Sequence, residues 1–495
     1  MNCNPLWIEK AKELEPALYH TQIKPVSGEL GKAMKAGDSV CFDFGDHFVG
    51  YAKIDFSSRG SHFDAPAWIR VRFAERLCEL GEKAEEYHGW ISKGWIQQEQ
   101  LHLDVLPCTL QMERRYAFRY ISIEVLDCSP KYALVVENIV CDTVTSADDG
   151  VLQAYQGDAE LAQLDRIACR TLRSCMQSVF EDGPKRDRRL WMGDLRMQAL
   201  ANYETYHNDA LVKRCLYLFA GSTLDRGKVG ACLFLDPEIE VDDTEMFDYS
   251  LFFIPTLLNY LEATGDRETA EELYDTAIRQ LRLARQQMDE NGIVRDSDRL
   301  GWCFVDWNLG LNKQAGAQGI YLYCLDSAIR LAALLGRPAE TMEEELRANR
   351  KAAKEFFWDA QRKLFVSGTE KQVSWASQVW LVLGGVLTQD EGAALLERME
   401  TDPEAEGMVT PYMYHNYVDA LIAVGQKEKA LEVLHRYWGG MARRGADTFW
   451  ELYDPADPNA SPYGGTIVNS YCHAWSCAPA YFLRKYYANA PEINA

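Results

Sequence analysis

The sequence predicts a mainly α-helical protein in which an antiparallel β-sandwich, residues 1–147, precedes a helical domain, residues 148–495. Two observations support this fold class. Apolar and polar residues alternate in several short segments before residue 147, and the apolar period becomes helical after Gly150. The chain has 495 residues, of which 47% are hydrophobic and 25% charged, so it has the length and the ordinary composition of a globular protein with more than one domain.

The first part of the chain contains short segments with the period of two that marks a half-buried strand. In the segment 68–73, Ile69, Val71 and Phe73 alternate with two arginines. Gly and Asp turns separate these segments, which is typical of antiparallel strands in a sandwich. The predicted strands are 39–44, 68–73, 120–125 and 133–140.

The rest of the chain is predicted to be helical. A first helix is indicated by apolar residues at helical spacing from Leu161 to Val179. Further helices are predicted at 267–283, 340–357 and 390–399, with Gly, Asp and Pro residues between periodic segments. Paired helices of this kind fit either an α/α toroid or an open helical superstructure.

The charge balance limits the partners of this protein. Fifty-two Lys and Arg against 74 Asp and Glu give a net charge of −22. Nucleic acid, an anionic membrane surface and polyanionic substrates all call for a basic face, so we expect none of them as partners. Neutral substrates remain open.

The N-terminal residues and the cysteines suggest a cytoplasmic protein without metal or other cofactor. No basic segment followed by an apolar run opens the chain, and no apolar run is long enough to span a bilayer. The 14 cysteines are scattered and form no CxxC motif, which disfavours a zinc site, and we expect no disulfides.

Acidic residues beside aromatic ones are the main candidates for chemistry. Motifs of serine hydrolases, zinc proteases, NTPases and dinucleotide enzymes are absent from the sequence. The acidic and aromatic residues gather instead in four segments, 181–194, 302–307, 449–451 and 469–475.

Sugar chemistry uses this set of groups. One carboxylic acid protonates the leaving oxygen, a second carboxylate activates water or attacks the anomeric carbon, and Asp, Arg and Trp side chains hold the ring. Each segment also has a structural alternative. In that alternative, segment 181–194 is an ion-pair loop that caps a helix, Trp307 and His473 are core residues, and Glu451 is a solvated carboxylate at a helix start.

The stretch from Asp182 to Asp194, Asp-Gly-Pro-Lys-Arg-Asp-Arg-Arg-Leu-Trp-Met-Gly-Asp, resembles the motif of glycoside hydrolase family 78, the α-L-rhamnosidases. That motif reads roughly Asp-Cys-Pro-x-Arg-(Asp/Glu)…Trp-x-Gly-Asp. The later segments resemble the family in the same order, and the run 114–120, Arg-Arg-Tyr-Ala-Phe-Arg-Tyr, is similar to part of its upstream β-sandwich.

The resemblance implies an (α/α)6 barrel and hydrolysis with inversion at the anomeric carbon. Asp187 falls at the position of the general acid and Glu451 at that of the general base. The resemblance assigns hydroxyl binding to Asp182, Arg186 and Asp194. It assigns the lining of the −1 pocket to Trp191, Asp306, Trp307 and His473.

One departure from the family concerns the acid, which is usually Glu. Asp187 is shorter by one methylene, which reduces its reach by roughly 1.5 Å and weakens proton transfer unless the backbone compensates. Arg188 follows it, so Asp187 is the only carboxylate left for the role. Inversion predicts a separation of about 6.5–9.5 Å between the two carboxyl groups. We expect Asp187 in the drier, less cation-rich part of the pocket, and Glu451 ionised.

The predicted function is therefore hydrolysis of terminal α-L-rhamnosyl or similar deoxy-sugar linkages in small glycosides, without metal or cofactor. A glycosidase of the same fold with another sugar specificity is one alternative, and a catalytically silent sugar-binding protein is another. A homo-oligomer is compatible with the sequence.

Overall fold

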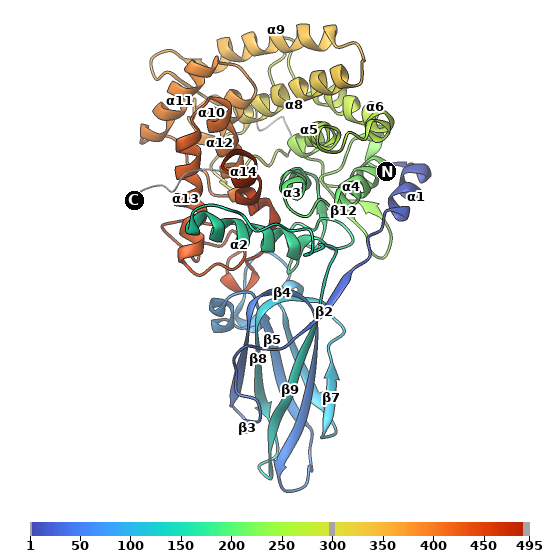
Figure 1. Ribbon diagram of the computed structural model, residues 1–495. Coiled ribbons are helices and arrows are strands. Elements are labelled where there is room, and N and C mark those ends of the chain that lie inside the picture. Colours follow the sequence, from blue (N-terminus) through green and yellow to red (C-terminus); the bar gives the residue numbers. More distant parts are fainter. Residues whose placement is uncertain (1, 297–301, 489–495) are drawn as a thin grey trace.

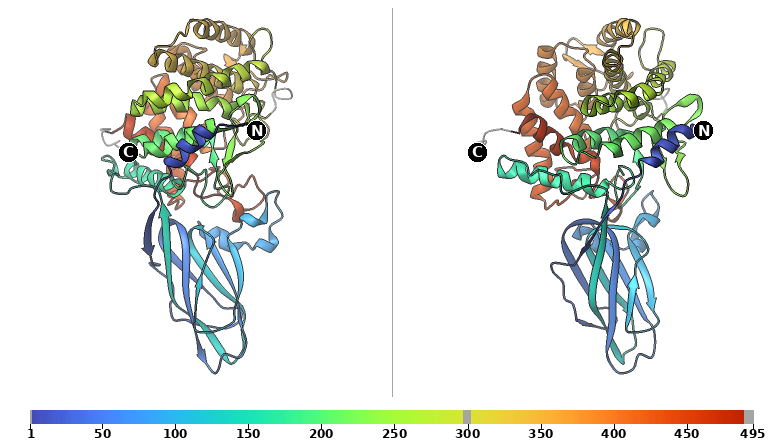
Figure 2. Two further views of the ribbon diagram at one scale, coloured as in Figure 1. Left: turned by 90° about the vertical axis from the view of Figure 1, so that its right-hand side faces the viewer. Right: turned by 45° about the vertical axis from the view of Figure 1, so that its right-hand side comes forward.

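The computed structural model describes residues 2–296 and 302–488. An elongated β-sheet part projects from one end of a larger helical part, as Figure 1 and the two turned views of Figure 2 show. The described part of the chain is mainly helical and begins with antiparallel strands, so the coarse fold class is confirmed.

The sheet part contains eight strands among the described residues, and all their pairings are antiparallel. Each predicted strand lies within one of them. The strands are β2 (Tyr19–Ile23), β3 (Ala33–Met34), β4 (Ser39–Gly60), β5 (Ala67–Ala74), β6 (Gln98–Leu103), β7 (Cys108–Gln111), β8 (Tyr116–Asp127) and β9 (Tyr132–Thr145).

Strand β4 joins all these strands into one hydrogen-bonded sheet, rather than the two sheets expected of a sandwich. Its first part pairs with β8, and its second part pairs with β9 and β7. The register with β8 shifts between Asp43 and Phe48, where the strand is irregular. Apolar side chains from both parts of β4 lie in one common core with those of β5, β8 and β9.

The helical part consists mainly of consecutive helices, and short connections within helix pairs alternate with longer connections between pairs. The predicted helices 267–283, 340–357 and 390–399 correspond to α6, α9 and α11. The helices are α2 (Ala159–Cys175), α3 (Met192–Glu204), α4 (Asp209–Gly221), α5 (Phe247–Thr264), α6 (Arg267–Ala284), α8 (Gln314–Leu334), α9 (Glu340–Phe357), α10 (Trp375–Leu383), α11 (Gln389–Thr401), α12 (Pro411–Ala423), α13 (Lys427–Arg443) and α14 (Ala478–Tyr486).

The helices pack as neighbouring pairs. Helices α3, α5, α8, α10 and α12 each contact the next in this series, and α14 contacts α3 and α2. Each member of the series also contacts the helix that follows it in sequence, α4, α6, α9, α11 or α13. The strands within this part are short, such as β10 (Leu190–Trp191), β12 (Cys232–Phe234) and β13 (Glu240–Val241). Across residues 2–296 and 302–488, no helix has the length and apolar character needed to span a bilayer.

The first residues lie on the helical part and not on the sheet. Helix α1 (Pro5–Glu13) packs against α4, where Trp7 stacks on Tyr217 at 5.6 Å between ring centroids. Strand β1 (Asn2–Cys3) pairs with β11 (Ser222–Thr223) of the helical part. The division at residues 147 and 148 stays a prediction, and the sheet itself begins at β2.

Candidate active site

A cavity of about 270 Å³ brings together most of the predicted site residues. The predicted residues come from the loop before α3 and the first turn of that helix, the loop before α8 and the loops between α13 and α14. Other lining residues come from the segment before α5, from the start of α5 and, in the case of Trp90 and Ile91, from the sheet part. The lining residues are Trp90, Ile91, Asp182, Arg186, Asp187, Arg189, Trp191, Asp194, Asp242, Thr244, Met246, Tyr249, Trp302, Phe304, Trp307, Glu451, Tyr463, His473 and Trp475.

The loop before α3 is a compact turn that aims several charged side chains into this cavity. Asp182 holds it closed, because its Oδ1 accepts a hydrogen bond from the Arg189 amide at 3.0 Å and its own amide donates to the Arg189 carbonyl. Gly183 packs so tightly that an added Cβ would lie 2.8 Å from Ser470 Oγ. Asp194 follows in the first turn of α3, where it is buried. Local sequence therefore places these groups within one short segment.

Arg186 links the two carboxylates that the resemblance assigns to catalysis. Its Nη2 pairs with Glu451 Oε2, and its Nη1 lies 3.7 Å from Asp187 Oδ1. The Tyr463 hydroxyl donates to the other Glu451 oxygen, Oε1. Burial raises the pKa of Glu451, while Arg186 and Tyr463 oppose that rise. The paired Arg186 guanidinium favours the ionised form of this carboxylate, while burial makes it more basic than an exposed one, which suits a general base.

Asp187 does not occupy the dry, cation-poor position that we expected. Its side chain is 25% exposed, against 6% for Glu451, and the Arg186 guanidinium lies beside it. The reason is geometric, because Asp187 directly follows Arg186 at the outer edge of the turn. The short Asp side chain therefore lines the cavity while it stays partly exposed to solvent.

A second group of carboxylates surrounds His473. Its Nδ1 lies 3.6 Å from Asp194 Oδ1, and its Nε2 lies 3.8 Å from Asp182 Oδ2. Burial and the Arg186 charge lower the pKa of His473 well below its ordinary value, so the imidazole is neutral. Burial and the neighbouring carboxylates raise the pKa of Asp182 and Asp194 well above theirs. Such groups can both donate to and accept from hydroxyls.

Several buried polar atoms of the cavity wall have no hydrogen-bond partner within the described part of the chain. They are Asp194 Oδ1, His473 Nδ1, Trp191 Nε1 and Trp307 Nε1. Buried polar groups are ordinarily paired, so this arrangement indicates a ligand that supplies both donors and acceptors. A sugar ring, with a hydroxyl on most of its carbons, has that character.

The structure places Asp306 away from the cavity. Its carboxylate accepts hydrogen bonds from the Val409 amide at 2.9 Å, the Thr410 hydroxyl at 2.6 Å and the Trp307 amide at 2.9 Å. Burial raises its pKa to about 6. Asp306 therefore joins the loop before α8 to the start of α12, whereas its neighbour Trp307 lines the cavity.

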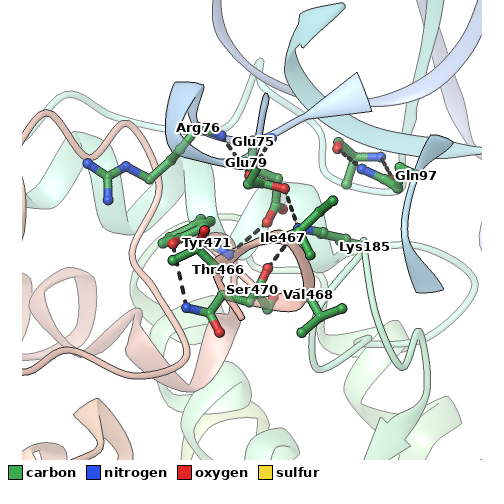
Figure 3. A network of polar contacts seen from close by, with 12 residues as sticks. Glu75, Arg76, Glu79, Gln97, Lys185, Thr466, Ile467, Val468, Ser470 and Tyr471 are labelled. Carbon is green, nitrogen blue, oxygen red and sulfur yellow. Dashed lines mark hydrogen bonds and ion pairs between the residues drawn. The ribbon is translucent and has the colours of Figure 1, made fainter. Parts of the chain in front are cut away.

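A buried polar network anchors these loops to the sheet part, as Figure 3 shows. Glu79 accepts hydrogen bonds from the amides of Glu75 and Arg76 and pairs with the Lys185 ammonium, the residue before Arg186. Lys185 also donates to the Asn469 carbonyl at 2.8 Å. Burial and the nearby Glu75 raise the pKa of Glu79 to about 7, against the opposing effect of Lys185.

Other contacts extend this anchorage to both ends of the site. Glu75 Oε2 accepts from the Tyr471 amide at 2.7 Å, two residues before His473. Arg115, in the predicted family motif 114–120, binds both oxygens of Glu181 at 2.7–2.8 Å, directly before Asp182. The sheet part therefore fixes the position of the catalytic loops.

Sequence reasoning missed several lining residues. Tyr463 contacts both Glu451 and Arg186, yet it lies in a Pro-Tyr-Gly-Gly turn with no acidic neighbour to draw attention to it. Trp90 and Ile91 lie in the sheet part, far along the chain from the four candidate segments 181–194, 302–307, 449–451 and 469–475. The signal available for Tyr463 was its position between two site segments, 449–451 and 469–475.

Comparisons with known proteins identify the family of this chain. Residues 156–487 match the family described as a bacterial α-L-rhamnosidase six-hairpin glycosidase domain, which defines the class of the helical part. Residues 12–143 match the glycosyl hydrolase family 78 α-rhamnosidase N-terminal domain. The chain belongs to glycoside hydrolase family 78, the α-L-rhamnosidases. A search of curated proteins gave no match.

Solved structures include one similar over the whole chain. It is a rhamnosidase from Klebsiella oxytoca with rhamnose bound, 45% identical over 98% of this chain and 99% of its own, with a TM-score of 0.94. The family 78 rhamnosidase of Bacillus sp. GL1 is 21% identical over 90% of this chain and 46% of its own, with a TM-score of 0.77. The Streptomyces avermitilis α-L-rhamnosidase complexed with L-rhamnose is 16% identical over 95% and 44%, with a TM-score of 0.70. The last two likenesses concern the fold alone.

Proposed function

We propose that this protein hydrolyses terminal α-L-rhamnosyl linkages of small glycosides with inversion at the anomeric carbon. The observation that carries the proposal is the placement of Asp187 and Glu451 on either side of one guanidinium, that of Arg186, in a cavity with Asp182, Asp194 and His473. The rhamnose-bound Klebsiella oxytoca relative supports the sugar. The packing of α3, α5, α8, α10, α12 and α14 within a layer of partner helices supports closure as an (α/α)6 barrel.

In the proposed reaction, Asp187 donates its proton to the glycosidic oxygen as the bond from that oxygen to the anomeric carbon breaks. Glu451 takes a proton from a water molecule, whose oxygen attacks the opposite face of the anomeric carbon. The products are free β-L-rhamnose and the alcohol of the leaving group. Arg186 keeps Glu451 ionised, and the exposed position of Asp187 lets it recover a proton from solvent.

The remaining lining groups suit a neutral deoxy-sugar. Five acidic residues and only two arginines line the cavity, so it offers an anionic sugar few cations to pair with. Met246, Phe304 and Trp475 provide apolar surface for the methyl group of rhamnose. Such a contact is worth about 1–3 kcal/mol against a sugar with a hydroxyl there. A related glycosidase with another sugar specificity, or a silent sugar-binding protein, are the alternatives to test.

Hydrolysis of a panel of aryl glycosides tests the proposal. The α-L-rhamnoside should be the preferred substrate, and NMR should detect the β-anomer of rhamnose first. Glu451→Gln should lower kcat by roughly 10²–10⁴-fold because it removes the base. Glu85→Gln, a surface change in the sheet part, serves as the control. Preference for another sugar, first appearance of the α-anomer, or near-normal turnover by Glu451→Gln would each contradict the part of the proposal it addresses.

A further inference from the structure

Trp90, a residue of the sheet part, lines the mouth of the cavity although it is distant in sequence from every catalytic segment. The residue is 67% exposed although its indole is fixed by contacts with Pro462 and Tyr463, and tryptophan is ordinarily much more buried. Resting on the function proposed above, we propose that Trp90 is the stacking platform for the leaving group and selects glycosides whose leaving group carries a ring.

The indole of Trp90 is held in place by the loop that carries Tyr463. Its Nε1 donates to the Pro462 carbonyl at 2.7 Å, and its ring lies 5.4 Å from the Tyr463 ring between centroids. The Tyr87 hydroxyl donates to the Tyr463 carbonyl at 2.7 Å. The platform is therefore fixed before a ligand arrives, and little conformational entropy is lost on binding.

Gly89 permits this close approach. A Cβ at that position would lie 1.9 Å from the Tyr463 carbonyl oxygen and 2.2 Å from the Tyr87 hydroxyl oxygen. Tyr87 packs in a small buried cluster with Ile96, Ile467 and Val468. The segment that carries Trp90 is thus tied to the helical part by packing as well as by hydrogen bonds.

The exposed surface of Trp90 is apolar, because the only polar atom of the indole is already paired with Pro462. The deep part of the cavity is instead lined by Asp182, Asp194 and His473. A volume of about 270 Å³ accommodates roughly one sugar ring, so the leaving group must lie at the mouth, beside Asp187. A flat apolar face there fits the C–H face of a sugar or an aromatic ring.

Three substrates separate this role from general catalysis: an aryl α-L-rhamnoside, a rhamnosyl-glucose disaccharide and methyl α-L-rhamnoside, whose leaving group has no ring. Trp90→Ala should lower kcat/KM roughly tenfold for the aryl compound, the disaccharide or both, and should leave the methyl rhamnoside within twofold. Which of the two is affected distinguishes an aromatic from a sugar leaving group. Trp90→Phe should retain most of the preference because it keeps a ring.

Trp68→Ala is the matched control, because Trp68 is an exposed tryptophan of the sheet part that stacks on His102 and does not line the cavity. Binding of L-rhamnose alone should be unchanged in Trp90→Ala. An equal loss for all three substrates, or no loss for either ring-bearing one, would overturn the proposal. If wild-type protein hydrolyses none of them, the proposed function fails, and calorimetric binding of the same compounds to wild type and Trp90→Ala still tests the contact.

Discussion

At the residue scale, Arg186 organises the site because its two terminal nitrogens face different carboxylates. Its guanidinium also lies over the Tyr463 ring, 4.1 Å from the centroid, and its Nε donates to the Val468 carbonyl at 3.1 Å. These contacts fix the guanidinium in one orientation. Arg186 and the Tyr463 hydroxyl both favour the ionised form of Glu451, so the basicity of this carboxyl depends on both partners.

Removal of the Tyr463 hydroxyl should shift the pH dependence of activity. The hydrogen bond favours the charged form of Glu451, so Tyr463→Phe raises the pKa of that carboxyl further. The base is then deprotonated only at higher pH, and the acidic limb of kcat/KM moves upward by roughly one to two pH units, since a hydrogen bond to a charged group is worth about 1.5–3 kcal/mol. A pH profile of kcat/KM measures the shift.

Tyr87→Phe is the control for that profile. It makes the same chemical change in a tyrosine that binds the Tyr463 carbonyl and does not contact Glu451. Its acidic limb should coincide with that of the wild type. An unmoved limb in Tyr463→Phe would show that Glu451 does not govern it.

The residues predicted from sequence were those in continuous motifs. Asp182, Arg186 and Asp194 share one segment, so their proximity follows from the chain itself. Tyr463 and Trp90 reach the cavity through the packing of loops separated by hundreds of residues, which no local pattern encodes. The opposite holds for Asp306, which lies in a continuous motif but does not line the cavity. Its neighbour Trp307 does so, while the Asp306 carboxylate accepts a hydrogen bond from the Val409 amide.

At the element scale, the predicted helices were those with a solvated face. Helix α9 matches its predicted range, 340–357, because charged residues cover one side and give a clear period. Helix α5 is buried over nearly its whole length and shows an apolar run without such a period. The change of partner along β4, from β8 to β9, was not predictable either. Alternation of apolar residues indicates the buried face of a strand and not the strands with which it pairs.

The turn after β5 is joined to the loop before α3 by the buried ion pair of Glu79 and Lys185. Above pH 7, where Glu79 is mostly ionised, Glu79→Gln should lower the free energy of unfolding by about 3–5 kcal/mol, because Lys185 then keeps a buried charge without its counterion. The double variant Glu79→Gln/Lys185→Met should recover part of that loss. Denaturant unfolding of the two single variants and the double variant measures the coupling.

Glu85→Gln is again the matched control, because the Glu85 side chain is 51% exposed and its partner Arg70 keeps a second ion pair, with Glu124 at 2.7 Å, so little stability should be lost. A double variant whose loss equals the sum of the two single losses would show that Glu79 and Lys185 stabilise the fold independently.

At the scale of the whole molecule, the sheet and helical parts share so many buried polar contacts that they should unfold together. The buried pair of Glu79 and Lys185 is one such contact, and Arg119 adds a partly buried one, since it binds Asp43 within the sheet and lies 3.4 Å from Asp447, four residues before Glu451. We expect one calorimetric transition, with equal calorimetric and van't Hoff enthalpies. Two resolved transitions would show that each part is stable without the other.

Helix α1 adds a consequence for biosynthesis. It is made before the sheet part, yet its partner α4 begins only at Asp209. While the ribosome makes the intervening segment, the strands can already pair with one another, since domains generally fold as units during synthesis. Ile8 and Ala11, which are buried once α1 docks, remain open to water and to chaperones until α4 emerges. Docking of α1 is thus a late step that follows synthesis of all the strands of the sheet, and it closes a long loop that contains the whole sheet, at a cost in entropy that grows only slowly with loop length.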